Sequence, residues 1–338
     1  MRRCWESGPK GAGGLEGDKP ENGLTLSPNS GEIPGIHPMK AALFSDVHGH
    51  LRVLLHLIRN WQIAHATHLD AALIAGDLGC FPDPSKFDRA TKRWIVRDPE
   101  EAGFAKYFTT PLAEVERLFE PEFGEFSAIR CPIVFVPGNH EDYGYIESAS
   151  KKAPAPNAPE NTFPVDCYKR FHCLRDGAFT TLLGEDSVRL RVADIWGIEN
   201  ARKDAPYQIK NSTVQQLRTQ GQTFDLLLTH DAPAEGYPTG GSRLITQVIR
   251  ACCPEIHLFG HVPPINGIHE YALTGSRTKL FVLKTVSFGM DQSEGLAGAM
   301  GILEWNGSRA GTEVVKDDWL QQMYSSNWER TLPECATA

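Results

Sequence analysis

Short apolar runs separated by turn-forming residues recur along the chain from about residue 39 to residue 305. A short apolar run bounded by Gly, Pro, Asn or Asp is typical of a strand that is buried on both faces. The runs that predict such strands are 40–44, 71–75, 133–136, 224–228, 256–259, 280–283 and 302–305. Residues 188–198 (VRLRVADIWGI) alternate instead, which predicts a strand with one exposed face.

Several of the segments between these strands have apolar residues at helical spacing. Residues 51–64 (LRVLLHLIRNWQIA) form the clearest one, and shorter helices are expected at 112–119, 213–219 and 243–251. Strands that alternate with helices indicate an α/β protein. Because the second half of the chain has additional strands without helices between them, we expect two mixed sheets rather than one parallel sheet.

Composition divides the chain into three parts. Residues 1–38 are rich in Gly, Pro, Ser and Asn without periodicity, so we expect a disordered N-terminal tail. Met39 directly precedes the first strand and is a second candidate for the start of the protein. Residues 39–310 form the expected folded domain, with a long polar insertion at 80–110, and residues 311–338 are expected to be a polar C-terminal tail.

The overall composition narrows the class of protein. With 41% hydrophobic and 22% charged residues, the chain has the balance of a soluble globular protein. Its net charge of -8 argues against a broad nucleic-acid-binding face but leaves room for a local basic groove. No signal peptide and no apolar run of the ~20 residues that cross a membrane is visible, so we expect no membrane partner. The eight cysteines form no C-x-x-C pair, which excludes a zinc ribbon and favours reduced thiols in a cytoplasmic protein.

Side chains that can bind metal directly follow five of the predicted strands. These segments read S-D-V-H-G-H at 45–50, G-D at 76–77, P-G-N-H-E at 137–141, T-H-D at 229–231 and G-H at 260–261. In α/β sheets, ligands bind at the carboxyl ends of the strands. We therefore expect the five segments to meet at one shared edge.

The side chains of these segments fit two adjacent divalent or trivalent ions. Carboxylates and imidazoles suit Mn, Fe, Zn or Ni, whereas a thiolate site would need cysteines that these segments lack. Asp46 and His48 are one residue apart, so on an extended backbone both side chains point to the same side and one ion can take both. Asp77 has two carboxylate oxygens and can bridge the two ions. The candidates that would complete the second site are Asn139, His230 and His261.

The series D-V-H-G, G-D, G-N-H-E, T-H and G-H resembles the calcineurin-like metallophosphoesterase superfamily, whose motifs occur in this order over about residues 39–290. The resemblance implies an α/β fold, a four-layer α/β/β/α sandwich with two mixed β-sheets flanked by helices. It implies that residues 39–310 are the catalytic domain and that His140 is a catalytic histidine that faces the scissile ester. The implied metal ligands are Asp46, His48, Asp77, Asn139, His230 and His261.

The resemblance also implies a reaction, two-metal-dependent hydrolysis of a phosphoester substrate. Two ions about 3.5–4 Å apart share a water whose pKa falls to about 7, and the bridging hydroxide attacks phosphorus in line. His140 then donates a proton to the leaving oxygen or stabilises it.

The chain departs from the family's motifs at two points. Many members have G-H-x-H at the fifth motif, where this chain has Pro263 in place of the second histidine, so the first metal site is one protein ligand short. The protein serine/threonine phosphatases of the superfamily carry G-D-x-x-D-R-G at the second motif, whereas residues 76–81 read G-D-L-G-C-F. The motif therefore does not identify the acid that orients His140, for which Asp83 and Asp88 are candidates.

The sequence leaves the substrate open. The region from residue 138 to residue 198 resembles RNA lariat debranching enzymes and their relatives, which favours a phosphodiester or a nucleotide, either free or within a nucleic acid. The alternatives are a phosphomonoesterase, with protein phosphatase activity disfavoured by the second motif, and a non-catalytic interaction scaffold of the same fold. The oligomeric state is not determined.

Several further residues near the motifs have two interpretations. His50 is expected either at the edge of the site or at the entry to the following helix, and Glu141 and Asp231 either support the ligands or face solvent. By position alone, a phosphate could be reached by Arg243, Lys284 and Ser287.

Overall fold

The computed structural model describes residues 37–333, apart from residues 153, 155, 156, 203, 222, 290 and 291. The tail expected at 1–38 lies outside the described residues, except for its last two positions.

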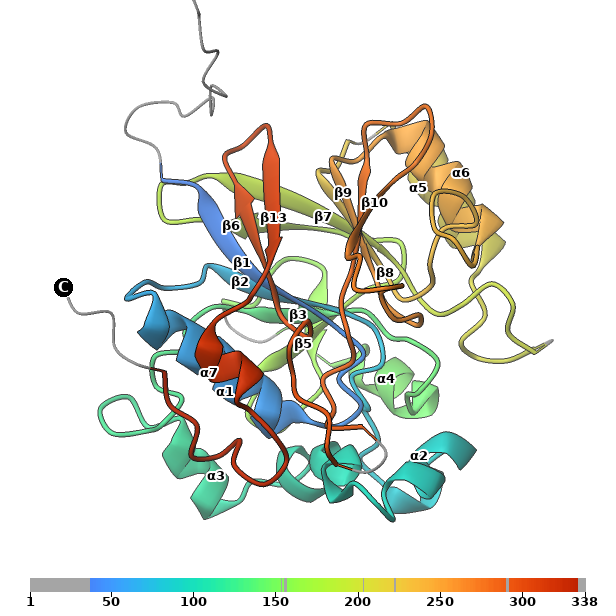
Figure 1. Ribbon diagram of the computed structural model, residues 1–338. Coiled ribbons are helices and arrows are strands. Elements are labelled where there is room, and N and C mark those ends of the chain that lie inside the picture. Colours follow the sequence, from blue (N-terminus) through green and yellow to red (C-terminus); the bar gives the residue numbers. More distant parts are fainter. Residues whose placement is uncertain are drawn as a thin grey trace, which may run out of the picture. The chain divides into compact units, whose positions relative to one another are not determined.

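The first of two mixed β-sheets has seven strands (Figure 1). They are β1 (Met39–Ser45), β2 (Ala71–Ala75), β3 (Ile133–Phe135), β4 (Thr162–Pro164), β5 (Phe171–Leu174), β12 (Gly301–Trp305) and β13 (Ala310–Val314). Their order across the sheet is β13-β12-β1-β2-β3-β5-β4. The four strands from β1 to β5 in this order are parallel, and β4, β12 and β13 pair antiparallel at the two edges.

The second sheet has six strands in the order β10-β11-β9-β8-β7-β6. They are β6 (Phe179–Leu183), β7 (Arg189–Ile195), β8 (Leu226–Thr229), β9 (Ile256–Phe259), β10 (Glu270–Ala272) and β11 (Lys279–Val282). The four central strands are parallel, and β6 and β10 are antiparallel edge strands. Two mixed sheets with flanking helices confirm the expected fold class.

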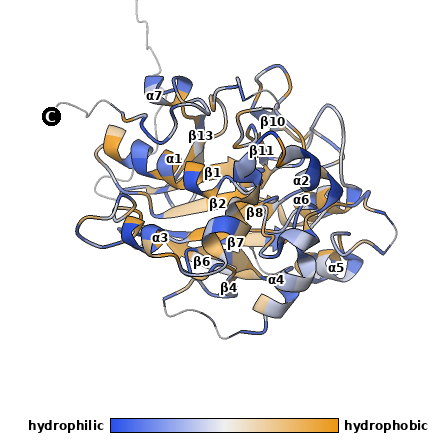
Figure 2. Cartoon of the chain, turned by 90° about the horizontal axis from the view of Figure 1, so that it is seen from below, coloured by the Kyte–Doolittle hydropathy of each residue, from blue (hydrophilic) through white to orange (hydrophobic). Residues whose placement is uncertain are grey.

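The helices lie on opposite sides of the pair of sheets (Figure 1). The α-helices are α1 (Leu51–Ala64), α2 (Arg89–Trp94), α3 (Ala113–Leu118), α4 (Tyr143–Ala149), α5 (Asn211–Thr219), α6 (Arg243–Cys252) and α7 (Asp318–Gln321). Helices α1, α3 and α7 lie on one side, and α5 and α6 pack together on the other. Figure 2 shows apolar strands at the centre and polar outer faces on the helices. Among the described residues, no helix is long and apolar enough to cross a bilayer.

Strand β8, which is buried at every position, shows why the sheets are apolar on both faces. Leu226 and Leu228 belong to the buried cluster of the seven-stranded sheet, whereas Leu227 belongs to the cluster that includes Ile245 and Ile249 of α6. Successive side chains of a strand point to opposite faces, so a strand between another sheet and a helical layer is apolar at every position. This arrangement explains the continuous apolar runs in the sequence.

The polar insertion and the polar C-terminal tail that the sequence predicts both contain regular secondary structure. The insertion at 80–110 contains α2 and three shorter turns, η1 (Pro84–Lys86), η2 (Pro99–Ala102) and η3 (Phe104–Phe108). Phe104 and Phe108 are fully buried. The polar tail expected at 311–338 instead contributes most of β13 and all of α7, whose Leu320 is fully buried. Isolated apolar residues in a polar context give no periodicity, which is why the sequence pattern missed both segments.

Candidate metal centre

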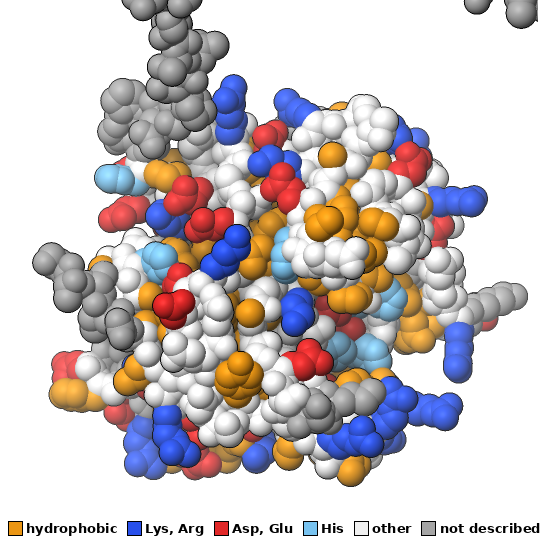
Figure 3. All heavy atoms as spheres, in the orientation of Figure 1, with side chains coloured by type: hydrophobic (Ala, Val, Ile, Leu, Met, Phe, Trp, Pro, Cys, Tyr) orange, Lys and Arg blue, Asp and Glu red, His pale blue; other side chains and the backbone are white. Residues whose placement is uncertain are grey.

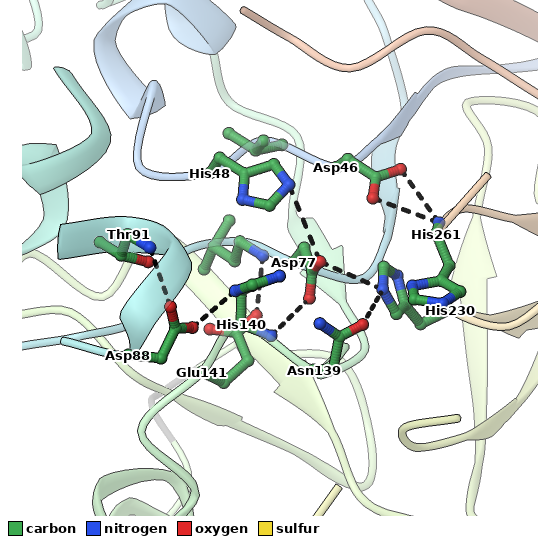
Figure 4. Close-up of polar contacts among 12 residues, drawn as sticks. Asp46, His48, Asp77, Asp88, Thr91, Asn139, His140, Glu141, His230 and His261 are labelled. Carbon is green, nitrogen blue, oxygen red and sulfur yellow. Dashed lines mark hydrogen bonds and ion pairs between the residues drawn. The ribbon is translucent and has the colours of Figure 1, made fainter. Parts of the chain in front are cut away.

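The five segments predicted to carry ligands meet where the two sheets approach each other. They follow the carboxyl ends of β1, β2 and β3 in one sheet and of β8 and β9 in the other. The Oγ atom of Ser45 donates to the Phe259 carbonyl oxygen at 3.1 Å, and this hydrogen bond joins the end of β1 to the end of β9. The structure therefore brings together all six predicted ligands, and Figure 4 shows them around Asp77.

Asp77 is at the centre of this group and is almost completely buried. Its Oδ2 atom lies 3.2 Å from Nε2 of His230 and 3.7 Å from Nε2 of His48. Its backbone carbonyl accepts hydrogen bonds from the amides of Val47 and His48, at 2.9 and 2.7 Å. These bonds hold the segment after β1 against the segment after β2. Asp77 therefore contacts the segment that carries His48 through its backbone and His230 through its side chain.

A glycine makes the close packing around Asp77 possible. A Cβ atom on Gly138 would lie 2.1 Å from Oδ1 of Asp77 and 2.7 Å from Cδ2 of His230. Only a residue without a side chain fits between two such groups.

The tautomer of His230 is set by its fully buried surroundings. Nδ1 lies 3.0 Å from the Ala75 carbonyl oxygen, which can only accept, so Nδ1 carries the proton. Nε2 then points at two further acceptors, Oδ2 of Asp77 and, at 3.1 Å, Oδ1 of Asn139. Three acceptor atoms that face one another need a positive charge between them, and a metal ion supplies it. The residues therefore fit a metal ion, with the second nitrogen of a ligand histidine held by a carbonyl as is common in metal sites.

A proton on His230 can supply the same positive charge. Burial alone would lower the pKa of this imidazole, but the adjacent Asp77 carboxylate raises the pKa of His230 to about 10. Burial alone would raise the pKa of Asp77, and the charge of His230 together with its hydrogen bond holds that pKa far below the usual range. Ligand atoms of Asp46, Asp77 and His230 all lie within 4.8 Å of one another, which makes this buried trio the core of the centre.

Asp46 and His48 are on the side of Asp77 that faces the end of β1. Burial raises the pKa of Asp46 to about 7, and its two carboxylate oxygens accept from the His261 amide at 3.2 Å each. Burial lowers the pKa of His48 to about 4, so its imidazole is neutral and has a lone pair for a metal. The extended exit expected after β1 is wrong, because His48 has a φ of 46° and the chain turns there. The turn still directs His48 toward Asp77.

His261 and Asn139 complete the group. The ring of His261 packs against the ring of His230, with centroids 5.1 Å apart. Its φ of 66° places it in a turn directly after β9, and its side chain is exposed at the surface of the centre. Pro263, two residues further, lines a cavity beside the centre and has no side-chain donor.

His140 lies beside the ligands and is held from two sides. Its amide donates to Oδ1 of Asp77 at 2.8 Å, and its Nδ1 lies 2.5 Å from Oδ2 of Asp88. The other ring nitrogen points toward the space between His48 and Asp77 (Figure 4). Burial would lower the pKa of His140, but the hydrogen bond to Asp88 and the charges of Asp77 and Asp88 raise that pKa to about 9.

Asp88 is therefore the partner of His140, and the second candidate, Asp83, is not. Oδ1 of Asp88 caps the N-terminus of α2 by accepting from the Thr91 amide at 2.8 Å, while Oδ2 holds His140. Asp83 caps η1 through Ser85 and is exposed. The sequence offered both acids without separating them, because the contact depends on how the insertion folds back.

Two buried acids support the ligand segments from behind. Glu141 accepts from the amides of Leu78 and Cys80 at 2.7 and 2.5 Å, so it supports the segment that carries Asp77. The Asp231 carboxylate is buried and accepts from the Glu199 amide at 2.9 Å. Neither acid faces solvent.

His50 does not touch the site surface, because it is fully buried at the entry to α1. Its Nδ1 lies 3.1 Å from the carbonyl oxygens of Val47 and His48, and its Nε2 lies 2.8 Å from Asp98. This contact joins the turn that carries His48 to the 80–110 insertion. Asp98 was not singled out in the sequence, and no local pattern there distinguishes it from other acids.

A comparison with protein families identifies the group to which the chain is related. The model of the calcineurin-like phosphoesterase family matches residues 39–264, which contain all the residues of the centre. The chain belongs to the calcineurin-like phosphoesterase family. In this family the centre typically holds two metal ions, and the buried Asp46, Asp77 and His230 of this member could bind metal.

Solved structures and curated proteins add little to the family assignment. One solved crystal structure is 14% identical in sequence, with a TM-score of 0.45. The match covers 82% of this chain and 100% of the chain in that structure. The crystal structure of TT1561 of Thermus thermophilus is 13% identical, with a TM-score of 0.43 and the same coverage. No curated protein matches the sequence.

Proposed function

We propose that this calcineurin-like phosphoesterase is a two-metal-dependent hydrolase of phosphodiesters. The observation that carries the proposal is the combination of six candidate ligands gathered around Asp77 with a histidine that is oriented by an acid. A scaffold that had lost catalysis would need neither the Asp88–His140 pair nor three acceptors that converge at His230.

The ligands divide into two sets that share Asp77. Asp46 and His48 would hold one ion with Asp77, while Asn139, His230 and His261 would hold the other. Oxygen and imidazole donors suit Mn, Fe, Zn or Ni. When bound, such ions supply Lewis acidity at the phosphoryl oxygens and activate water at neutral pH.

His140 acts as the general acid in this proposal. Asp88 accepts from Nδ1, so the other ring nitrogen is directed toward the ligand group, where it can deliver a proton (Figure 4). Transfer of that proton to the leaving oxygen avoids the release of an alkoxide, an effect worth about 10²–10⁴-fold.

A diester fits better than a phosphorylated protein. The second acid and the arginine of the phosphatase motif G-D-x-x-D-R-G are absent, and Cys80 and Phe81 are buried in that segment. The histidine is oriented by an acid of the insertion instead. A phosphomonoester remains the second candidate, because the same ligand group can bind its phosphoryl oxygens.

The proposal is tested with bis-p-nitrophenyl phosphate and p-nitrophenyl phosphate, each with Mn²⁺, Fe²⁺, Zn²⁺ or Ni²⁺ added to metal-depleted protein. We expect metal-dependent turnover, faster on the diester, with the metal-deficient Asp77→Asn variant as the inactive reference. Faster turnover of the monoester would support the second candidate. No turnover of either ester with any metal would favour the interaction scaffold.

A further inference from the structure

Helix α2 carries a basic face in a protein whose net charge is -8. Arg89, Lys92 and Arg93 are spaced i, i+3 and i+4, which places them on one side of the helix, while Thr91 on the opposite side is buried. The three basic side chains are exposed and form no ion pair within the described part of the chain. Exposed cations that no carboxylate neutralises are free to bind an anion.

Among the described residues, no acid near α2 forms an ion pair with this face, and Asp98, which precedes the η2 segment packed against α2, is held by His50. Asp83 lies close enough to Lys86 for their charges to interact, so Lys86 is left out of the basic face. Asp88 at the start of the helix is engaged by His140 and the Thr91 amide. Figure 3 shows Lys and Arg side chains gathered over the α2 region, next to a hollow where Asp or Glu and His side chains are visible.

The basic face is attached directly to the reaction centre. Asp88 caps α2 through one carboxylate oxygen and orients His140 through the other. Arg89 directly follows Asp88 in the chain, and Asp88 is the partner of the catalytic histidine. Helix α2 therefore begins directly after the residue that orients His140.

Trp94, at the end of α2, lines a cavity of about 460 Å³ between the helix and the segment after β11. Pro263, two residues after the ligand His261, lines the same cavity. The segment after β11 is itself attached to the centre, since the Val286 amide donates to the Asp46 carbonyl oxygen at 2.9 Å. The cavity is therefore adjacent to the metal ligands.

The remaining lining of the cavity is polar and mixed in charge. Thr285 and Ser287 contribute hydroxyl groups, Glu294 contributes a carboxylate and Lys284 an ammonium group. An aromatic ring beside groups that both donate and accept hydrogen bonds suits a nucleobase, which stacks on aromatic side chains and bonds through its edge. A carboxylate at this position disfavours a second phosphate there and favours a base.

We infer that the substrate is a single-stranded nucleic acid, with the phosphate next to the scissile one on Arg89, Lys92 and Arg93 and a base in the Trp94 cavity. The inference rests on the proposed function, because the same metal centre cleaves the phosphodiester bond to give an alcohol and a phosphomonoester at the expense of one water. A basic stripe with an aromatic platform is the combination by which proteins bind single strands without reading their sequence.

The test compares a substrate that has neighbouring phosphates with one that has none. The double variant Lys92→Gln/Arg93→Gln is assayed on oligothymidylate, oligouridylate and bis-p-nitrophenyl phosphate. We expect KM for the oligonucleotides to rise on the order of tenfold, with kcat unchanged and bis-p-nitrophenyl phosphate unaffected. The slope of log KM against log salt should fall by about 0.7 for each phosphate that the variant no longer neutralises.

The matched control is Arg218→Gln/Arg250→Gln, which removes two positive charges from α5 and α6 on the other side of the molecule (Figure 1). This variant should leave the salt slope and KM unchanged. Trp94→Ala should also raise KM for the oligonucleotides, and Trp94→Phe should restore most of the affinity because it keeps an aromatic face.

Two results separate the failure of this inference from failure of the proposed function. If the wild-type protein hydrolyses bis-p-nitrophenyl phosphate but the α2 double variant handles oligonucleotides as well as wild type does, the nucleic-acid site is overturned and the hydrolase stands. Equal losses in the double variant on all three substrates would also overturn the site. If bis-p-nitrophenyl phosphate is not hydrolysed with any metal, both proposals fall together.

Discussion

Oδ2 of Asp88 lies 2.5 Å from Nδ1 of His140, although the two residues are 52 positions apart in the chain. This pair supplies the orienting acid that the second sequence motif lacks. It also links the histidine to the basic helix α2, which begins at Arg89. In the proposed mechanism, catalysis and substrate binding therefore share one residue of the insertion.

Replacing Asp88 by Asn should lower kcat on a dinucleoside phosphate, whose leaving group is an alkoxide, by about 10–100-fold, the usual cost of losing a partner that orients a functional group. Asn still caps α2 through its side-chain oxygen, so stability should change little. His140→Ala should cost about 10²–10⁴-fold in kcat. Asp83→Asn is the matched control, because Asp83 caps η1 in the same insertion without touching His140. Equal activity of Asp88→Asn and Asp83→Asn would contradict the orienting role.

Replacing Asp77 by Asn should cause loss of metal, because one anionic oxygen that faces both His48 and His230 becomes neutral. Elemental analysis of the purified variant should show less bound metal than wild type. His140→Ala serves as the reference that keeps its metal, since His140 is not among the ligands. Full metal content in the Asp77 variant would exclude it as a bridging ligand.

Replacing Gly138 by Ala should disrupt the centre without any change of charge. The new methyl group would meet Oδ1 of Asp77 at 2.1 Å and the ring of His230 at 2.7 Å, so both ligands must move. We expect metal affinity and kcat to fall by at least about tenfold, in line with the cost of disturbing ligand positions. Gly311→Ala in β13 is the control, because its methyl group would meet only ordinary contacts at 3.9 Å. Normal metal affinity in Gly138→Ala would contradict the tight packing.

His257 makes stability depend on pH. It is fully buried in β9, its Nε2 lies 2.7 Å from the Thr229 hydroxyl, and its Nδ1 has no partner among the described residues. Burial lowers the pKa of His257 from 6.5 to about 3. The unfolded chain therefore binds a proton that the folded chain does not, so stability is present above pH 6.5 and is lost as the pH falls toward 3.

His257→Gln removes this titration, and the free energy of unfolding of the variant should fall less between pH 7 and pH 5. The difference in that fall should be on the order of 2 kcal/mol. Denaturant unfolding at several pH values measures it, and His68→Gln, at an exposed position, is the control. Parallel curves for wild type and His257→Gln would show that this histidine is protonated in the folded state.

The meeting of the candidate ligands was predictable because each of them is local to a strand end. Asp77 and His230 each follow an apolar run within two residues. The run predicts the strand, and the spacing predicts that the candidate ligand lies at the end of that strand. The parallel order of the central strands then brings these ends together. The same logic failed for the shape of the turn at His48, since a positive φ at a residue other than glycine has no strong sequence signal.

The sequence alone predicted the α/β class and the five strand ends with candidate metal ligands, because these depend on residues that are neighbours along the chain, and the order of its motifs singled out His140. Only the tertiary structure decided that Asp88 rather than Asp83 meets His140, that Asp98 anchors His50 and that residues after 310 complete a sheet. It also decided where the basic face of α2 lies. These outcomes depend on how distant segments pack, and a local pattern has no information about the partner that a side chain will meet across the fold.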